Sequence, residues 1–506
     1  MIWSIVASRR GGIINRLLTG KRLFALALVF LLSVAVASQI HAAAPRPKII
    51  FILADDLGYG ELGSYGQTMI QTPNLDRMAR EGMRFTQFYA GSTVCSPSRS
   101  VLMTGRHTGH TRVRGNTKPE NPLPQSLRPE DVTVAKMLKD AGYSTALIGK
   151  WGLGDEAGGE VGLPNRQGFD YFFGYLNNRH AHNYYPAYLI KNESHYLLEN
   201  VVPGEGRFGQ SWATKRVQYS PDLMAKESLQ WIEENKGKPF FLYLAYTIPH
   251  ANNELTLSTG NGQEVPDYGI YKDKDWSEQN KGQAAMITRM DAEIGRLFEL
   301  LKKLGLDEKT LVFFSSDNGP HKEGGNDPEF FDANGPLRGI KRSLTDGGIR
   351  IPFLARWPGK IKAGTVSPYV GYFGDLMATV AELTGVKPPA NLDSLSLVPT
   401  LLGRVQEQKK HEFLYWEFHE GGSSQAVLMN GRWKGIRLER RTAPLELYDL
   451  QNDIGEANNV AAEHPDIVAE IEAYLKTARN DNPDWPLRDA PPPNTVRISP
   501  PAPNPP

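Results

Sequence analysis

Two adjacent acidic residues, Asp55 and Asp56, follow directly after the apolar run 49–54. A short run of this kind predicts a buried strand, so both carboxylates would lie at its carboxyl end, where open α/β sheets bind ligands. Neighbouring carboxylates repel each other unless a cation lies between them, and hard oxygen donors suit calcium, with magnesium as the alternative. Taken alone, the pair fits a solvated loop equally well.

A second apolar run, 311–316, ends in the same way, with Asp317 and Asn318. Parallel strands of one sheet end at the same edge, so four oxygen donors are expected to converge there on one cation. The alternative is that Asn318 only begins a turn before Gly319. Matched oxygen donors after two separate strands favour the metal site.

The only cysteine, Cys95, opens the string Cys-Ser-Pro-Ser-Arg, which continues to Thr-Gly-Arg at 104–106. Pro97 suits the first turn of a helix, so residue 95 is expected at a helix start, where amides and the helix dipole favour an anion. The guanidinium of Arg99 adds a fixed positive charge with several hydrogen-bond donors. A single cysteine cannot form an internal disulfide, so Cys95 is either an inert core residue or a chemically converted one.

This string resembles the signature of the type I sulfatases, whose cysteine is oxidised to formylglycine (3-oxoalanine) by a formylglycine-generating enzyme. The resemblance extends from Pro47 to about Ala461 and implies an alkaline phosphatase-like fold. It implies a sulfuric ester hydrolase in which residue 95 is both nucleophile and metal ligand. A hydrated aldehyde offers one hydroxyl to attack sulfur and a second to expel sulfate, and a metal would lower the pKa of the attacking hydroxyl.

Three further residues match positions that hold the sulfate in similar enzymes. They are Lys150 in Gly-Lys-Trp, His250 in Ile-Pro-His, and Lys341 shortly before Thr-Asp-Gly-Gly at 345–348. The resemblance implies that Lys150, Lys341 and Arg99 bind the sulfate and that His250 protonates the departing alcohol. Such groups neutralise charge on the sulfuryl oxygens, most effectively in a dry site.

One residue departs from the family pattern. Similar enzymes have a histidine two residues after the catalytic lysine, where it contacts the formylglycine, and this chain has Gly152. His180 and His182 are the nearest substitutes in sequence. The alternative is that these two histidines bind substrate or simply pack.

Alternating apolar runs and amphipathic stretches from Pro47 predict an α/β fold, with a mostly parallel sheet covered by helices on both faces. The expected strands are 48–54, 143–148, 240–246, 310–316 and 351–356. The expected helices are 73–80, 132–141, 222–234, 283–304 and 375–384.

Short strands at 413–418, 425–429, 432–437 and 445–448 predict a smaller antiparallel sheet, covered by a helix over 465–478. We therefore predict a catalytic domain at 47–395 and a C-terminal α+β subdomain at 396–485. A proline-rich tail, 486–506, is expected to be disordered from about Pro491.

The first 44 residues carry five basic residues and no acid, followed by an apolar run at 23–37 and three alanines at 42–44. This pattern predicts a secretory signal peptide and an exported, periplasmic or secreted protein, with an uncleaved anchor as the alternative. The rest of the chain has a net charge of −4. A weakly acidic body predicts no nucleic-acid partner.

The resemblance favours a sulfated carbohydrate as substrate over a small aryl ester. One alternative keeps the metal and the formylglycine and hydrolyses a phosphodiester or a phosphonate. Another is an inactive protein that binds sulfated glycans, which the glycine at position 152 would suit.

Overall fold

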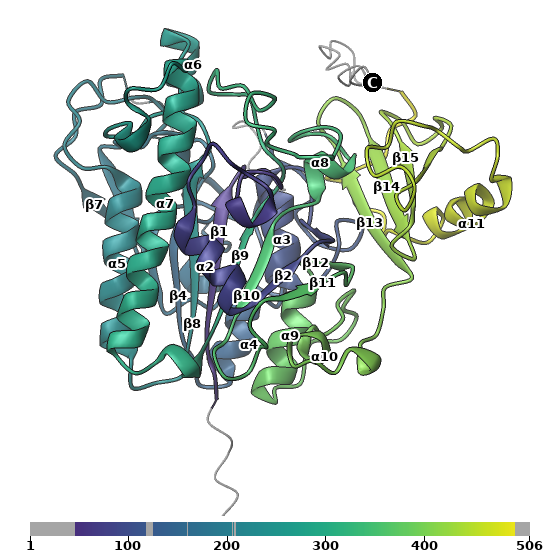
Figure 1. Cartoon of the computed structure of the whole chain (residues 1–506), viewed down its shortest axis with the longest axis horizontal. Coiled ribbons are helices and arrows are strands. Elements are labelled where there is room, and N and C mark those ends of the chain that lie inside the picture. The colour runs from purple at the N-terminus through teal and green to yellow at the C-terminus, as the bar shows by residue number, and fades with distance from the viewer. Residues whose placement is uncertain (1–45, 118–124, 159, 205, 207–208, 491–506) are drawn as a thin grey trace, which may run out of the picture. The chain divides into compact units, whose positions relative to one another are not determined.

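The computed structural model describes residues 46–117, 125–158, 160–204, 206 and 209–490 (Figure 1). Its centre is strand β1 (Lys48–Asp55), which pairs in parallel with β8 (Phe240–Pro249) and β9 (Thr310–Ser316). Beyond β8 follow β4 (Ser144–Lys150) and β5 (Tyr171–Tyr175), also parallel. All five strands therefore end at the same edge of the sheet.

Five shorter strands complete a ten-stranded sheet with the order β11-β2-β10-β9-β1-β8-β4-β5-β6-β7. They are β2 (Met83–Phe85), β6 (Tyr188–Lys191), β7 (Ser194–Leu197), β10 (Phe353–Arg356) and β11 (Thr365–Ser367). Strand β10 runs antiparallel to β9, and β6 and β7 form an antiparallel hairpin at the far edge. A two-stranded sheet pairs β3 (Phe88–Tyr89) with β12 (Gly371–Tyr372).

Helices cover both faces of the central sheet, as predicted. Alternate residues of β1 point into two separate hydrophobic cores, so this strand is buried on both sides. One face carries α2 (Pro73–Glu81), α5 (Ser220–Asn235) and α7 (Glu278–Lys303). The other carries α3 (Cys95–Thr104), α4 (Val134–Asp140) and α9 (Asp375–Thr384).

The expected elements are confirmed, with shifted ends where a cap decides the boundary. Helix α4 starts at Val134 rather than residue 132 because Thr133 caps it, its side chain accepting from the Lys136 amide at 3.0 Å. Helix α7 starts five residues before the predicted position because Ser277 caps it in the same way. The sequence did not reveal the β6–β7 hairpin, in whose second strand all four residues are exposed.

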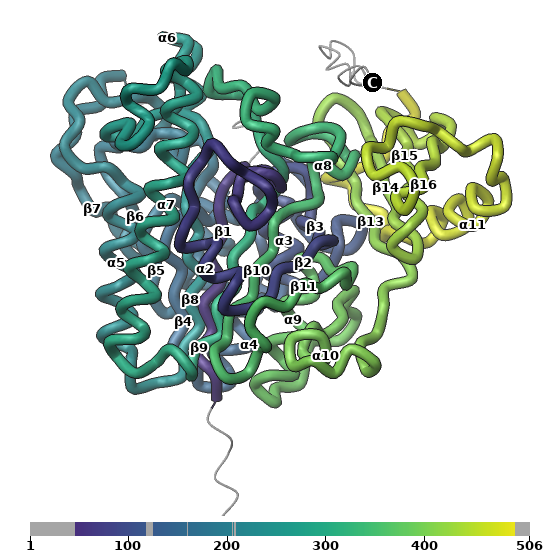
Figure 2. Tube along the Cα trace, in the orientation of Figure 1, coloured from purple at the N-terminus to yellow at the C-terminus, as the bar shows by residue number. Residues whose placement is uncertain are grey.

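The C-terminal sheet is antiparallel, as predicted, with the order β13-β14-β15-β16. Its strands are β13 (Phe413–Phe418), β14 (Ser424–Met429), β15 (Trp433–Arg437) and β16 (Glu446–Asp449). Helix α11 (Pro465–Leu475) packs against it through Ile471 and Leu475. In Figure 2 this region lies beside the short helix α8 (Asp346–Ile349). Two other short helices are α6 (Asn253–Thr259) and α10 (Val398–Leu401).

Buried contacts join the C-terminal sheet to the segment after β3 and to α8. The Trp416 indole on β13 donates to the Ala90 carbonyl at 2.9 Å, and Lys434 Nζ on β15 lies 2.8 Å from Asp346 Oδ1 on α8. Residues from Pro47 onward form one compact unit. The subdomain boundary at residues 395 and 396 stays a prediction.

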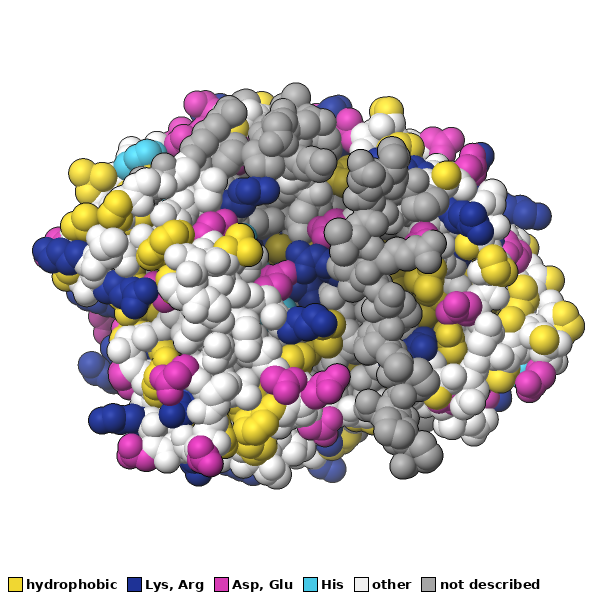
Figure 3. Space-filling view, turned by 90° about the horizontal axis from the view of Figure 1, so that it is seen from above, with side chains coloured by type: hydrophobic (Ala, Val, Ile, Leu, Met, Phe, Trp, Pro, Cys, Tyr) yellow, Lys and Arg dark blue, Asp and Glu magenta, His cyan; other side chains and the backbone are white. Residues whose placement is uncertain are grey.

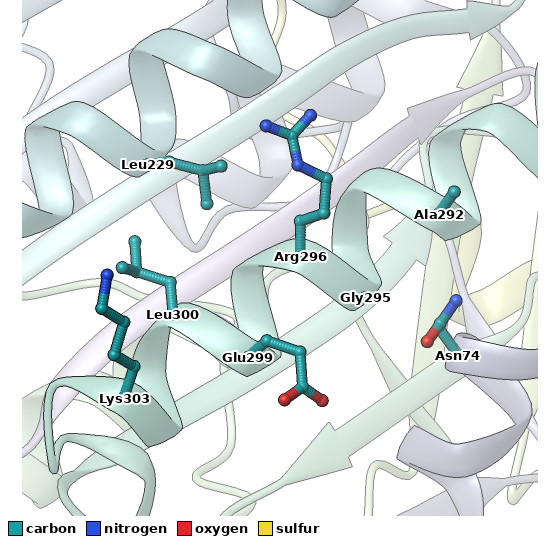
Figure 4. Close-up of a pocket in the computed structure, with 8 residues that line it drawn as sticks. All are labelled: Asn74, Leu229, Ala292, Gly295, Arg296, Glu299, Leu300 and Lys303. Atoms are coloured by element: carbon teal, nitrogen blue, oxygen red, sulfur yellow. The ribbon is translucent and has the colours of Figure 1, made fainter.

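The expected signal peptide at 1–44 and the proline-rich end from Pro491 lie outside the described residues. None of the helices that the structure describes is long and apolar enough to cross a membrane. A surface pocket lies along α7, between α2 and α5 (Figure 4). Its lining residues are Asn74, Leu229, Ala292, Gly295, Arg296, Glu299, Leu300 and Lys303, none of which belongs to the predicted site.

The Lys434–Asp346 pair generates a stability prediction, because both side chains are fully buried. Replacing Lys434 with Met should lower the free energy of unfolding by about 3 kcal/mol, since a buried carboxylate loses its nearest cation. Arg350, 3.3 Å from Asp346, limits the loss. Denaturant unfolding measures the difference. The control Lys410→Met, at an exposed position, should change stability by less than about 0.5 kcal/mol.

Candidate active site

The predicted oxygen donors meet at the carboxyl ends of β1 and β9. The Asp56 amide donates to Asp317 Oδ1 at 3.1 Å, and Asn318 Nδ2 donates to Asp56 Oδ1 at 2.7 Å. Asp55, Asp56, Asp317 and Asn318 are at most 1% exposed. Asp56 adopts a φ of 66°, a left-handed conformation that is rare outside glycine and typical of functional positions.

Cys95 is the first residue of α3 and lies beside the carboxylates, so the predicted helix start is confirmed. Its Sγ and carboxylate oxygens of Asp55 and Asp317 all lie within 4.8 Å of one another. The residue is 4% exposed, and burial raises the pKa of its thiol. An unmodified Cys95 would therefore be a protonated thiol near neutral pH and a weak nucleophile.

Three buried cations balance the three carboxylates. Arg99 donates from Nε and Nη2 to Asp317 Oδ2 at 3.0 and 2.8 Å, and from Nη1 to the Lys150 carbonyl at 2.8 Å. Lys150 Nζ lies 2.6 Å from Asp55 Oδ2, and Lys341 Nζ lies 2.8 Å from Asp56 Oδ2. The lysines are 1% and 6% exposed and the arginine is fully buried.

The pKa values of Asp55 and Asp317 shift in opposite directions. Burial opposes ionisation of Asp55, but Lys150 and then Arg99 outweigh it and hold its pKa below the ordinary value. Burial, followed by the charge of Asp55, raises the pKa of Asp317 to about 7. Arg99 and Lys150 lower the pKa of Asp317 without offsetting burial and the charge of Asp55, so a further cation beside this carboxylate would be electrostatically favourable.

Two buried oxygens identify where a cation fits. Asp55 Oδ1 and Asn318 Oδ1 have no hydrogen-bond partner. Buried acceptors of this kind are rare in folded proteins and call for a partner such as an ion or water. Both belong to residues predicted from sequence as metal ligands. The donor set, carboxylate and amide oxygens, fits a hard divalent cation.

His250 faces Lys341 on the outer side of the cluster. Its Nδ1 lies 2.7 Å from the Ala251 carbonyl, so that nitrogen carries the proton, and Nε2 accepts from Lys341 Nζ at 3.1 Å. Burial and then Lys341 lower the pKa of His250 to about 3. The imidazole is therefore neutral here, and any proton that it delivers from Nε2 must first be gained from elsewhere.

The two histidines proposed as substitutes for the family histidine occupy different surroundings. The ring of His182 stacks on His250, with centroids 4.9 Å apart, and its Nδ1 lies 3.1 Å from Glu254. The ring of His180 packs against Tyr175 and Tyr188 and is 3% exposed. Thus His182 reaches the site through His250, whereas His180 is packed among aromatic rings.

Amide side chains fill the space beside Gly152. Asn178 Nδ2 and Gln125 Nε2 both donate to Ser96 Oγ at 2.8 Å, and Gln125 also donates to the Gly152 carbonyl at 3.1 Å. The Asn116 side chain lies 3.9 to 4.0 Å from Cys95 Sγ. An amide therefore faces residue 95 instead of a histidine. Asn116 belongs to no sequence motif that would have identified it.

Three partly exposed charged residues border the site and are here called the rim triad: Glu323, Arg342 and Glu420. Glu323 Oε2 lies 3.0 Å from Lys341 Nζ, and its other oxygen pairs with Arg342. Arg342 Nε donates to Glu420 Oε2 at 2.9 Å. None of the three belongs to a motif that the sequence analysis identified. Figure 3 looks onto this edge of the sheet and shows basic and acidic side chains gathered in a hollow.

The sulfatase family profile matches residues 47–386, about two thirds of the chain. The chain belongs to the sulfatase family. A second profile, for the C-terminal region of N-sulphoglucosamine sulphohydrolase, matches residues 340–481. The sulfatase is thus a sulfuric ester hydrolase, and the resemblance inferred from the Cys95 motif is confirmed.

Curated relatives align with most of the sulfatase. N-acetylgalactosamine-6-sulfatase of Mus musculus is 34% identical and covers 80% of this chain and 74% of its own. N-acetylgalactosamine-6-O-sulfatase of Bacteroides thetaiotaomicron is 29% identical, covering 86% and 93%. Arylsulfatase A of Homo sapiens is 32% identical, covering 85% and 86%.

Solved structures support the alkaline phosphatase-like fold. The crystal structure of Ps i-CgsB in complex with k-i-k-neocarrahexaose superposes with a TM-score of 0.71 at 28% identity, covering 87% of this chain and 94% of that one. The phosphonate monoester hydrolase of Agrobacterium radiobacter has a TM-score of 0.58 at 20% identity, covering 85% and 95%, and shares the fold alone.

Gly152 generates the second prediction. Its φ is +77°, and an added Cβ would lie 2.7 Å from Asn178 Oδ1 and 3.2 Å from Ser96 Oγ. Gly152→Ala should destabilise the protein by about 2 kcal/mol, because backbone strain and steric contact add. The control Gly260→Ala has the same φ class and nothing within 4 Å, so it should show only the strain, about 1 kcal/mol. Equal losses in thermal unfolding would contradict the steric contact.

Proposed function

We propose that this sulfatase hydrolyses a sulfate ester on a carbohydrate, using a formylglycine formed from Cys95 and a bound calcium ion. The observation that carries the proposal is the convergence of two strand ends on Cys95, with two buried ligand oxygens left without partners. The formylglycine hydrate would supply one hydroxyl that attacks sulfur and a second that expels sulfate. The ion would lower the pKa of the attacking hydroxyl and withdraw charge from the sulfate.

Asp55, Asp56, Asp317, Asn318 and residue 95 would hold the ion. Calcium accommodates 6–8 oxygen ligands in flexible geometry, which suits a site assembled from two strands and a helix start. Magnesium demands a more regular octahedron and is the alternative. A divalent charge would favour the ionised form of Asp317, because it opposes the effects of burial and of the Asp55 charge that raise the pKa of this carboxyl.

We assign different roles at the sulfate to the three basic side chains. Lys150 and Lys341 present buried ammonium groups beside Asp55 and Asp56, while Arg99 holds Asp317 and the Lys150 carbonyl. Charged donors held in a water-excluded site stabilise developing negative charge strongly. Lys341 donates to His250 Nε2, so the Lys341–His250 pair is the proton source that we assign to the departing alcohol.

A carbohydrate substrate is proposed from the names of similar proteins and from the polar border of the site. Curated relatives include sulfatases named for N-acetylgalactosamine, and one similar structure is a complex with k-i-k-neocarrahexaose. The rim triad and the amides near Gly152 offer hydrogen bonds that suit sugar hydroxyls. We further propose an exported protein whose cysteine is converted by a formylglycine-generating enzyme.

The nucleophile is tested on protein made in a host that contains the maturation enzyme. The peptide around Cys95 should show the mass of the aldehyde, and Cys95→Ala should lower kcat on a sulfate ester by at least about 10⁴-fold. Finding only thiol in an active preparation would contradict the proposal. Faster turnover of matched phosphodiesters or phosphonates than of sulfate esters would favour the alternative chemistry.

Cation binding is tested by thermal unfolding. Chelation should lower the melting temperature and calcium should restore it, because a ligand at 100 times its Kd stabilises the folded state by about 2.7 kcal/mol. Asn318→Ala should reduce the calcium-dependent shift. Asp393→Asn alters a separate group, His107, His110 and Asp393, and should leave the shift intact. A shift that vanishes in Asp393→Asn and persists in Asn318→Ala would move the cation away from β1 and β9.

A further inference from the structure

We propose that the rim triad, Glu323, Arg342 and Glu420, selects the sugar by binding hydroxyl groups next to the sulfate ester. The enzyme would then favour a sugar with one sulfate over a sugar that carries a second anionic group next to that sulfate. The inference rests on the proposed carbohydrate substrate and adds the residues that distinguish one sulfated sugar from another.

The rim triad spans the site from the proton source to the nucleophile. At one end, Glu323 Oε2 lies 3.0 Å from Lys341 Nζ and 3.4 Å from His250 Nε2. At the other end, Glu420 Oε1 accepts from Asn116 Nδ2 at 3.3 Å, and Asn116 contacts Cys95. A substrate whose sulfate lies between Lys341 and residue 95 must place its neighbouring atoms along this span.

The rim triad is accessible, whereas the groups assigned to the sulfate and the cation are buried. Its side chains are 17%, 33% and 31% exposed in chain order. Arg99, Lys150, Asp55, Asp56 and Asp317 are at most 1% exposed. Recognition of the sulfate and recognition of the group that carries it are therefore made by different sets of residues.

The central arginine is held rigidly. Arg342 has a φ of +75°, a left-handed conformation, and its amide donates to the Thr93 carbonyl at 3.1 Å, two residues before Cys95. Its guanidinium donates from Nε to Glu420 and from Nη1 to Glu323. A side chain fixed by its backbone and by two partners gives a stereospecific contact, unlike a freely rotating surface arginine.

The charge and bonding of the rim triad favour hydroxyls over anions. The two carboxylates and one guanidinium of the triad carry a net charge of −1. Arg342 already binds both carboxylates, and Lys341 is already paired with Glu323 and Asp56. A second sulfate or a carboxylate would have to displace one of them against like charge. A hydroxyl can donate to a remaining carboxylate lone pair without breaking the Arg342 pairs, because an ionised carboxylate has about four acceptor sites.

The test uses Glu420→Gln and Arg342→Lys, because Glu323 touches Lys341 and His250 directly. The probes are 4-methylumbelliferyl sulfate, N-acetylgalactosamine 6-sulfate and its 4,6-disulfate, and the corresponding galactose sulfates. The native enzyme should favour the monosulfated sugars over the disulfated ones in kcat/KM by about tenfold or more. In each variant, kcat/KM on the monosulfated sugars should fall by at least about tenfold more than kcat/KM on the aryl sulfate. The preference of each variant for monosulfated over disulfated sugars should fall to about threefold or less.

The control Arg441→Gln removes an exposed arginine that pairs with Asp489 and should keep the native preference. Melting temperatures of all variants show whether they fold; if Arg342→Lys does not, Glu420→Gln decides. Equal losses on aryl and sugar sulfates, or a native preference for disulfated sugars, would overturn the inference. Turnover of the aryl sulfate alone would instead refute the carbohydrate substrate, and turnover of no sulfate ester would refute the proposed function itself.

Discussion

Burying three carboxylates within a few ångströms of one another is the constraint around which this fold is organised. Asp55, Asp56 and Asp317 would repel one another and lose their hydration if nothing compensated them. The compensation comes from Arg99 on α3, Lys150 at the end of β4 and Lys341 in the loop after β9. No local stretch of chain could gather these groups. The parallel strands bring them to one edge, and the two hydrophobic cores hold that edge rigid.

The same convergence explains why much of the site could be predicted from sequence. An apolar run followed by acidic residues marks the carboxyl end of a buried strand, and two such runs must meet if their strands are parallel. Pro97 marked the start of α3, which places Cys95 at the first position of that helix. The predicted metal ligands and the helix start are each marked by a short stretch of sequence that also fixes their place in the fold. Their positions could therefore be predicted from the sequence.

The rim could not be predicted in this way. Glu420 reaches the site from the turn between β13 and β14, 325 positions after Cys95 in the chain, and nothing in its neighbours distinguishes it from a solvated acid. Asn116 and Asn178 act through contacts that depend on the packing of several loops. The exposed β7 strand was missed because its residues show no buried face. Polar contacts between residues far apart in the chain produce no periodic pattern of apolar and polar residues, so the sequence does not indicate them.

The hairpin β13–β14 combines two roles within a few residues. Trp416 is fully buried and donates to the Ala90 carbonyl, which anchors the strand to the segment between β3 and α3, while Glu420 lies in the adjoining turn at the border of the site. An anchor this close to the turn allows the turn to change in length or charge while the strand stays in register. A change in the length or charge of this turn would therefore alter the border of the site and leave the carboxylates of β1 and β9 in place.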